Sequence, residues 1–241
     1  MIKKKLHERI HVVYEDRDII VVDKSHGILS YPVEGEREES AIQLIRRYWK
    51  AIRSKSEHLY LLHRLDRETS GLLVFAVSSL ARASLLEQFA DHSVVRSYIA
   101  VTQGIPANKE KRIETFLGRD VRGRRSVTSK GKAAVTLYRV LKENRLANRA
   151  LIRCYLETGR THQVRIHLAH VGAPVIGDPV YARSGTRSRN TPGRMALHAE
   201  ALGFIHPRTG RPFLLRTSIP QQLKAMLERG AGAAGTTIGG A

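Results

Sequence analysis

The sequence predicts an α+β protein: a single catalytic domain with a largely antiparallel or mixed central sheet flanked by helices. Three observations favour this class. Strand-like segments outnumber helix-like segments, several of them neighbour one another along the chain, and the 241 residues suffice for a sizeable core. With 42 % hydrophobic and 26 % charged residues, the composition is ordinary for a globular protein.

Short apolar runs rich in β-branched residues and bounded by turn residues predict the strands. In chain order, they are expected at residues 17–25, 71–78, 96–104, 113–117, 132–143, 150–158, 196–207 and 212–220. The turn-prone stretches 144–148 and 208–210 each join two consecutive strands, which predicts two hairpins.

Apolar residues at intervals of three and four predict helices over residues 39–53, 79–91 and 158–172, and the pattern of 220–228 predicts a fourth. Ser40 and Thr161 are placed to cap the first and third, and Pro220 suits the first turn of the last. The predicted apolar faces comprise Ile42, Ile45, Trp49 and Ile52, then Leu85, Leu86 and Phe89, then Val164, Leu168 and Val171.

The charge of the chain points to a polyanionic partner. Lysine and arginine number 41 against 22 acidic residues, a formal net charge of +19, and nucleic acid is the commonest polyanion in a cytosol. Segments 118–132 and 181–194 mix basic residues with glycine and serine and lack an apolar period, so we expect mobile surface loops, either merely solvated or in contact with phosphates. The candidates for RNA-backbone contacts are Arg119, Arg122, Arg124, Arg125, Lys130, Lys132, Arg187 and Arg189.

Cysteine usage and the absence of long apolar runs favour a cytoplasmic protein with no membrane contact. Cys154 is the single cysteine, which excludes an intrachain disulfide and a cysteine-rich zinc site. The basic start of the chain lacks the apolar stretch of a signal peptide. His162, His167 and His170 lack the spacing of a metal-binding motif, so we expect structural or RNA-contacting histidines and no bound metal.

Polar residues crowd the stretch LLHRLDRETSGLLVFA, residues 61–76, between two apolar runs. Asp66 lies there, just before Gly71 opens a strand, and the neighbouring arginines favour its ionised form. A carboxylate held on such a loop can act as a nucleophile or a general base. Alternatively, Arg64 and Asp66 form a simple ion pair while Thr69 and Ser70 cap a turn.

This stretch resembles the signature H-R-L-D-x-x-T-S-G of the RluA-type pseudouridine synthases. Further segments resemble the same family in the same order: residues 21–32, 94–104, 157–182 and 197–210. Because the resemblance spans about residues 9–219, we expect a catalytic domain over 9–229, a basic N-terminal extension over 1–8 and a disordered Gly/Ala-rich tail over 230–241. The chain is similar to the short members, which have no N-terminal S4 RNA-binding module.

The resemblance implies an isomerase that converts specific uridines of ribosomal or transfer RNA to pseudouridine, with no metal or organic cofactor. Asp66 matches the catalytic aspartate, and whether it attacks C1′ or promotes a glycal intermediate stays open. Tyr98 matches the tyrosine that packs against the target base, and Arg165 matches the arginine that orients the aspartate. Val164 and Ile166 are expected to form part of the apolar wall of the active site.

The resemblance also implies base flipping, because C1′ of a stacked uridine is out of reach. Arg64 matches the residue that fills the gap left by the base, and His63, Thr69 and Arg96 are expected to assist it or to contact RNA. Two departures from the family pattern affect affinity or loop shape: Arg96 replaces the usual lysine, and Lys24-Ser25 and Tyr31 stand where Lys-Pro and His are frequent.

The expected partner is structured RNA, bound by a monomer without an obligate protein partner. The alternative function is a non-catalytic RNA-binding or RNA-chaperone protein that retains the same fold. The set Asp66, Tyr98 and Arg165 favours the enzyme, because a pure RNA binder gains nothing from a carboxylate in a channel for phosphates.

Overall fold

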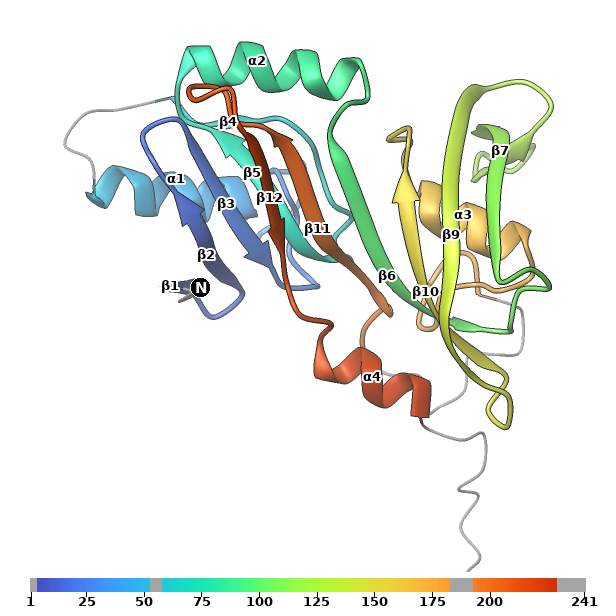
Figure 1. Ribbon diagram of the computed structural model, residues 1–241. Coiled ribbons are helices and arrows are strands. Elements are labelled where there is room, and N and C mark those ends of the chain that lie inside the picture. The colour runs from blue at the N-terminus through green and yellow to red at the C-terminus, as the bar shows by residue number, and fades with distance from the viewer. Residues whose placement is uncertain (1–3, 53–57, 183–192, 229–241) are drawn as a thin grey trace, which may run out of the picture.

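Twelve strands form one continuous sheet in the computed structural model, which describes residues 4–52, 58–182 and 193–228 (Figure 1). The strands are β1 (Lys4–His7), β2 (Ile10–Glu15), β3 (Ile19–Lys24), β4 (Tyr60–Leu61), β5 (Ser70–Ala76), β6 (Val95–Gln103), β7 (Glu110–Arg119), β8 (Arg125–Thr128), β9 (Lys132–Asn144), β10 (Arg149–Leu156), β11 (Leu197–Ile205) and β12 (Pro212–Arg216). The helices are α1 (Ala41–Ile52), α2 (Ser79–Ala90), α3 (Gln163–His170) and α4 (Gln221–Glu228).

The strands follow the order β1-β2-β3-β5-β11-β6-β10-β9-β7-β8, with β4 paired to β5 and β12 to β11. The pair β5–β11 is parallel, and the other pairs among these strands are antiparallel. Strand β11 comes late in the sequence, yet it lies between β5 and β6. It therefore joins a first half of the sheet, β1-β2-β3-β5, to a second half, β6-β10-β9-β7-β8. The predicted fold class is therefore confirmed.

The alternation of side chains along β3 and β5 gives each helix of the first half its own face of the sheet. Ile20, Val22 and Phe75 pack with α1, while the intervening side chains pack with α2 through Ala81 and Leu85. In the second half, α3 and α4 pack into one core with the central strands β6 and β10. No helix among the described residues is both long and apolar enough to cross a bilayer.

Both predicted hairpins are present, as β9–β10 and β11–β12, and each predicted strand has a counterpart. Strands β1, β2, β4 and β8 were not predicted, because they are short or border charged residues. Strand β1 lies within the expected N-terminal extension and pairs with β2. The domain boundaries at residues 9 and 229 stay predictions.

Three local expectations were wrong. Segment 118–132 is not a loop: it contains the end of β7, a turn, β8 and the start of β9, because ladder hydrogen bonds order a ribbon that has no apolar period. Thr161 does not cap α3, since the residue before this helix is His162, in the left-handed region at φ 59° and without a side-chain cap. Ile52 and Leu86 are exposed rather than buried.

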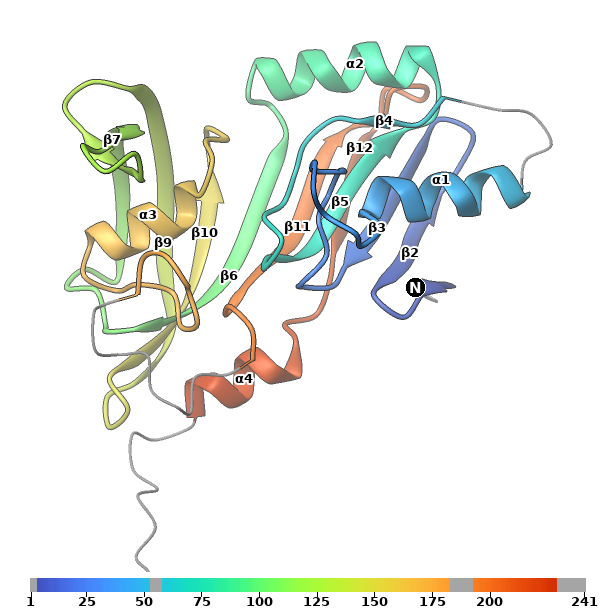
Figure 2. The same cartoon turned by 180° about the vertical axis from the view of Figure 1, so that it is seen from behind.

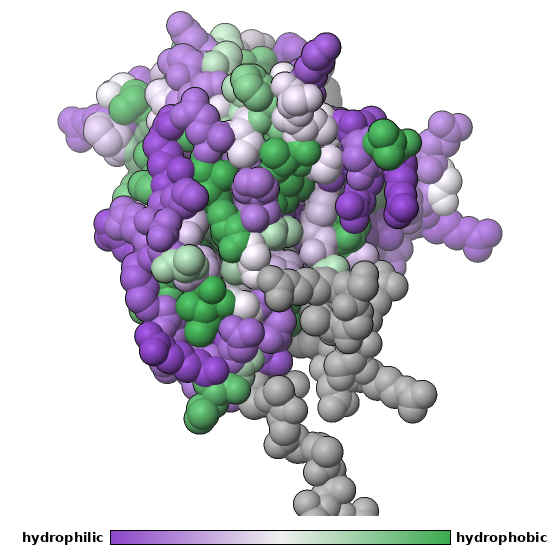
Figure 3. Space-filling view, turned by 90° about the vertical axis from the view of Figure 1, so that its right-hand side faces the viewer, coloured by the Kyte–Doolittle hydropathy of each residue, from purple (hydrophilic) through white to green (hydrophobic). Residues whose placement is uncertain are grey.

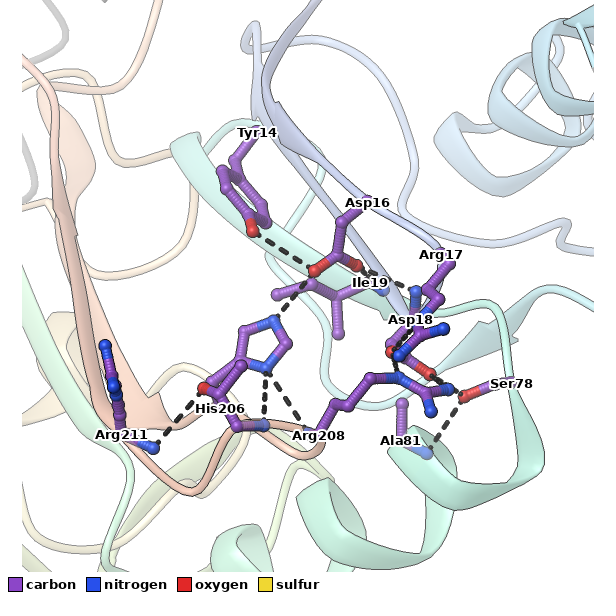
Figure 4. Close-up of polar contacts among 11 residues, drawn as sticks. Tyr14, Asp16, Arg17, Asp18, Ile19, Ser78, Ala81, His206, Arg208 and Arg211 are labelled. Carbon is purple, nitrogen blue, oxygen red and sulfur yellow. Dashed lines mark hydrogen bonds and ion pairs between the residues drawn. The ribbon is translucent and has the colours of Figure 1, made fainter.

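A cluster of polar side chains joins the β2–β3 turn, the β11–β12 turn and the start of α2 (Figure 4). Asp16 accepts a hydrogen bond from the Nε2 of His206 at 2.8 Å, which links the β2–β3 turn to the β11–β12 turn. Asp18 is buried, pairs with Arg208 and accepts from Ser78, the N-cap of α2, at 2.7 Å. Since these groups satisfy one another, the cluster fixes the turns that frame the sheet.

Candidate active site

The loop that carries Asp66 connects β4 to β5 and is held to the end of β3 and the loop after it. The hydroxyl of Ser30 donates to the carbonyl of Leu65 at 2.8 Å and accepts from its N–H at 3.0 Å. The carbonyl of Arg67 accepts from the N–H of Gly27 at 2.8 Å and from Nζ of Lys24 at 3.3 Å. These contacts fix the backbone on both sides of Asp66.

Gly71 lets β5 approach β11 directly after this loop. Its φ is 119°, in the region that favours glycine, and a Cβ there would come within 2.2 Å of the carbonyl oxygen of Ala199. A side chain at this position would push the two strands apart. The glycine of the signature is therefore required by the close approach of two backbones.

Asp66 is paired with an arginine 99 residues further along the chain. The Nη1 of Arg165 donates to Oδ2 of Asp66 at 3.0 Å, and the Asp66 side chain keeps 19 % of its surface exposed. Arg165 lies in α3 and is itself buried. Arg64 instead hydrogen-bonds to the hydroxyl of Tyr31, so the simple Arg64–Asp66 ion pair is not formed.

Asp178 holds Arg165 in place from the other side. Its two carboxylate oxygens accept from Nε and Nη2 of Arg165 at 2.7 and 2.8 Å, a bidentate pair. Oδ1 also accepts from the N–H groups of Val180 and Tyr181. Burial acts to raise the pKa of Asp178, but the Arg165 contacts and these backbone donors outweigh it, and the pKa lies below its ordinary value.

His162 is the second basic side chain near Asp66. Its Nε2 lies 3.8 Å from Oδ1 of Asp66, and its Nδ1 lies 3.1 Å from the hydroxyl of Tyr181. Burial lowers the pKa of His162 despite the nearby carboxylate. The ring is therefore neutral at pH 7, and Arg165 supplies the positive charge beside Asp66.

These groups border a cavity of about 540 Å³. The loop before β5 and helix α3 lie on opposite sides of β6, and residues of all three line the cavity (Figure 2). The predicted site residues that line it are His63, Arg64, Asp66, Thr69, Arg96, Tyr98, Val164 and Arg165. Segments distant in the sequence thus meet at one pocket, although the functional roles of these residues stay predictions.

Tyr98 forms part of the cavity wall from the centre of the sheet. It lies on β6, opposite Cys154 on one side and Ala199 on the other. Burial raises the pKa of Tyr98 to about 12, so its hydroxyl keeps its proton at neutral pH. The ring offers a flat, half-buried apolar surface close to the carboxylate.

The residues predicted to assist base flipping differ in their exposure. Arg64 is exposed at the cavity, with its guanidinium carbon 4.6 Å from the centre of the Tyr31 ring. Thr69 is buried, and its N–H closes a turn on the carbonyl of Asp66 at 3.1 Å. Arg64 is thus the exposed member of this group.

His63 has a structural task in the loop. Its Nε2 accepts from the N–H of Val74 at 3.1 Å, and its ring stacks on Phe89 with centroids 4.9 Å apart. Burial lowers the pKa of His63 to about 3, so the ring is neutral and able to accept. These contacts anchor the loop to β5 and α2.

The wall prediction was wrong for Ile166. Val164 lines the cavity, but Ile166 is two residues further along α3 and therefore points away from it. It packs instead with Leu117 on β7 and Ala134 on β9.

Several residues that organise the site were not predicted. Asp178, Tyr181, Ser30 and Lys24 lie within the segments that resemble the family, but none was assigned a role. The signal that could have found Asp178 is a carboxylate directly after Gly177 in a turn, within a stretch that is otherwise apolar.

The basic ribbon of β7 and β8 lies beside the site. The positive charge of Arg124 acts on Tyr181, which packs against Arg165. Arg124 is partly neutralised by Asp120 at 3.3 Å, and Nη1 of Arg119 donates to the carbonyl of Gly123. Arg122, Lys130 and Lys132 are exposed, and Arg125 is half-buried. Arg187 and Arg189 lie outside the described residues.

The model of the RNA pseudouridylate synthase family matches residues 18–170, more than half of the chain. The chain belongs to the RNA pseudouridylate synthase family. This confirms the resemblance to RluA-type enzymes and the assignment as an isomerase that acts on RNA.

Two relatives from bacteria show how far the family likeness extends. The chain is 35 % identical over 223 residues to the "Uncharacterized RNA pseudouridine synthase YlyB" of Bacillus subtilis (strain 168). It is 36 % identical over 231 residues to the "Ribosomal large subunit pseudouridine synthase D" of Zymomonas mobilis. Each match covers 91 % of this chain and 72 % of the relative.

A solved structure shares the fold of this family member. "Human RNA Pseudouridylate Synthase Domain Containing 1" superimposes with a TM-score of 0.75 at 26 % identity, over 93 % of this chain and 90 % of that one. The likeness therefore extends over both halves of the sheet.

Proposed function

We propose that this pseudouridine synthase isomerises selected uridines of ribosomal RNA, with Asp66 as the catalytic residue. The observation that supports this most directly is the chain of contacts Asp66–Arg165–Asp178 at the wall of a cavity that also contains Tyr98. A carboxylate that is partly exposed and fixed by a buried arginine is suited to act on a sugar carbon.

The reaction conserves all atoms of the nucleotide. The bond between N1 and C1′ breaks, the uracil turns, a bond forms between C5 and C1′, and the proton lost from C5 is balanced by the one gained at N1. Positive character develops at C1′ as the first bond breaks, and the negative charge of Asp66 stabilises it. Arg165 orients the carboxylate, and Tyr98 packs against the uracil.

Ribosomal RNA is the substrate we favour, because relatives of 33 to 37 % identity carry the name "Ribosomal large subunit pseudouridine synthase D". The exposed arginines of the β7–β8 ribbon supply positive charge for its phosphates.

The decisive experiment compares pseudouridine maps of total RNA from cells that lack this gene and from cells that carry the wild-type or the Asp66→Asn form. We expect a pseudouridine that is lost on deletion, restored by the wild type and absent with Asp66→Asn. The purified variant should bind RNA within about threefold of the wild type, because the substitution is nearly isosteric.

The outcome that contradicts this assignment is normal pseudouridine formation by Asp66→Asn. If deletion changes no pseudouridine while the protein still binds RNA, the non-catalytic RNA-binding function takes precedence.

A further inference from the structure

Arg96 carries a positive charge that the described part of the protein leaves uncompensated. The residue is 8 % exposed, and its Nε and Nη2 are buried without a hydrogen-bond partner among the described residues. No carboxylate in that part of the chain forms an ion pair with it. Buried guanidinium groups are normally paired, because an unpaired one loses its hydration without compensation.

The surroundings of Arg96 do not supply the missing acceptor. The guanidinium carbon lies 5.9 Å from the centre of the Phe89 ring, and the nearby charge of Arg160 is of the same sign. Gly159 also lies next to the guanidinium, because a Cβ at this position would come within 2.6 Å of Nη1 of Arg96. The absence of a side chain at residue 159 is thus what leaves room for the guanidinium.

Arg96 also lines the cavity that contains Asp66. It lies two residues before Tyr98 on β6, so both side chains leave the same face of the strand, roughly 6.5 Å apart along it. This spacing is comparable to the separation between the sugar and an adjoining phosphate within one nucleotide. An anion in the cavity is therefore within reach of Arg96 when a nucleoside lies against Tyr98.

We infer that Arg96, with Arg160 beside it, binds a phosphate group that flanks the target uridine. This inference rests on the proposed function and adds a contact to the same site: the enzyme recognises the flipped residue as a nucleotide, through its phosphate as well as its base. A charged guanidinium with free donors is the side chain best suited to a phosphate.

The test measures nucleotide binding in the absence of turnover. Uridine, uridine 5′-monophosphate, uridine 3′-monophosphate and uridine 3′,5′-bisphosphate are titrated by calorimetry into the full-length wild type and into Arg96→Gln. We expect the wild type to bind the bisphosphate roughly 10-fold or more tighter than uridine, the size of a charge-assisted contact. Arg96→Gln should bind both equally well and keep the affinity of the wild type for uridine.

Three further variants separate phosphate binding from a structural role of Arg96. Arg211→Gln removes an exposed arginine on the β11–β12 turn and should keep the full preference for the bisphosphate. Arg96→Lys keeps the charge and should retain part of that preference. Gly159→Ala keeps Arg96 but displaces its guanidinium, and should weaken the preference even if Arg96→Gln fails to fold.

The two monophosphates identify which side of the uridine the arginine contacts, since the favoured isomer carries the phosphate that Arg96 binds. The inference fails if the wild type shows no preference for the bisphosphate at concentrations up to about 10 mM, or if Arg96→Gln loses uridine and bisphosphate affinity alike. Because no turnover is measured, failure here leaves the proposed activity standing, and loss of that activity leaves the phosphate preference measurable.

Discussion

The charges at the site form a short alternating chain in which each member orients the next. Asp178 holds Arg165 through two hydrogen bonds, and Arg165 reaches Asp66 with its remaining nitrogen. Arg165 and Asp178 are buried, whereas Asp66 keeps part of its surface open to the cavity. The position of the Asp66 carboxylate thus depends on a residue that does not contact it.

Asp178→Asn tests this dependence. The amide keeps the shape of the side chain but leaves Arg165 poorly paired, so the free energy of unfolding should fall by about 3 kcal/mol. The rate of pseudouridine formation should fall further than RNA affinity does. Urea unfolding and single-turnover kinetics measure these effects, with the exposed Glu87→Gln on α2 as the control.

The loss of stability in Asp178→Asn should also depend on pH. The pKa of Asp178 is lower in the folded protein than in the unfolded chain, so its stabilisation is present above the unfolded value of about 4 and is lost as the pH falls through the folded value. The stability difference between wild type and Asp178→Asn should therefore shrink in acid. A difference independent of pH would mean that the charge of Asp178 is unimportant.

Arg64→Ala separates base extrusion from chemistry. If the guanidinium replaces the flipped uridine in the stack, the variant should lose about tenfold or more in activity on a folded RNA. It should lose much less on a short unpaired oligonucleotide, where little stacking must be broken. Tyr31→Phe keeps the ring beneath Arg64 and removes only the hydroxyl, so a small effect is expected. Equal losses of Arg64→Ala on both RNAs would contradict this role.

At the scale of elements, the loop that carries Asp66 is held in place by β3 and by the loop that follows β3. Lys24, the last residue of β3, is fully buried, and its amine donates to the carbonyls of Ser25, Ile28 and Arg67. One side chain thus connects the strand end, the following loop and the loop of Asp66.

Lys24→Met tests the electrostatic consequence of this burial. Desolvation lowers the pKa of Lys24 from 10.5 to about 7, so above pH 7 the unfolded chain binds more protons than the folded one. The contribution of Lys24 to stability is accordingly greatest above the unfolded pKa and is lost as the pH falls through 7. Between pH 7 and 9, the wild type should gain up to about 1.4 kcal/mol per pH unit relative to the variant.

Urea unfolding of both proteins at several pH values measures this gain. Because the two chains share all other titrating groups, their difference isolates Lys24. Parallel stability curves would show that the amine titrates as it does in water.

The whole molecule combines a large positive charge with a basic ribbon beside the cavity. The net charge is +19. Figure 3 shows hydrophilic side chains along the margins of the face that carries β7 to β9 and α3, with hydrophobic residues between them. Phe116 on β7 is half exposed. This distribution suits an RNA surface, whose phosphates need charge and whose unstacked bases accept apolar contacts.

Neutralising Arg122, Arg124 and Arg125 tests whether RNA follows the ribbon. The triple substitution to glutamine should weaken RNA binding and reduce the slope of log affinity against log salt by about two. The matched control replaces Arg46, Arg47 and Arg211, which are exposed on α1 and on the β11–β12 turn. A slope equal to that of the wild type would place the ribbon outside the RNA path.

Much of the fold was readable from local patterns. Short apolar runs rich in β-branched residues located β3, β5 and β9, and helical spacing located α1 and α2, because these patterns record which side chains face the core. Cross-strand pairing overrode the same reasoning at residues 118–132, where a polar segment became a strand of the β7–β8 ribbon through its hydrogen bonds to a neighbour.

The sequence by itself pointed to the family, identified Asp66 as the candidate catalytic residue and predicted that Arg165 lies near it. Only the tertiary structure decided that Asp178 anchors Arg165 and that Arg96 is left without a partner in the described residues. The physical reason is that these contacts depend on packing: Asp66 meets Arg165 across 99 residues of sequence, and Asp178 reaches back to Arg165 from beyond the end of α3. Strand β11, inserted between β5 and β6, joins the half of the sheet that carries Asp66 to the half that carries Arg165, and local side-chain patterns do not encode this order.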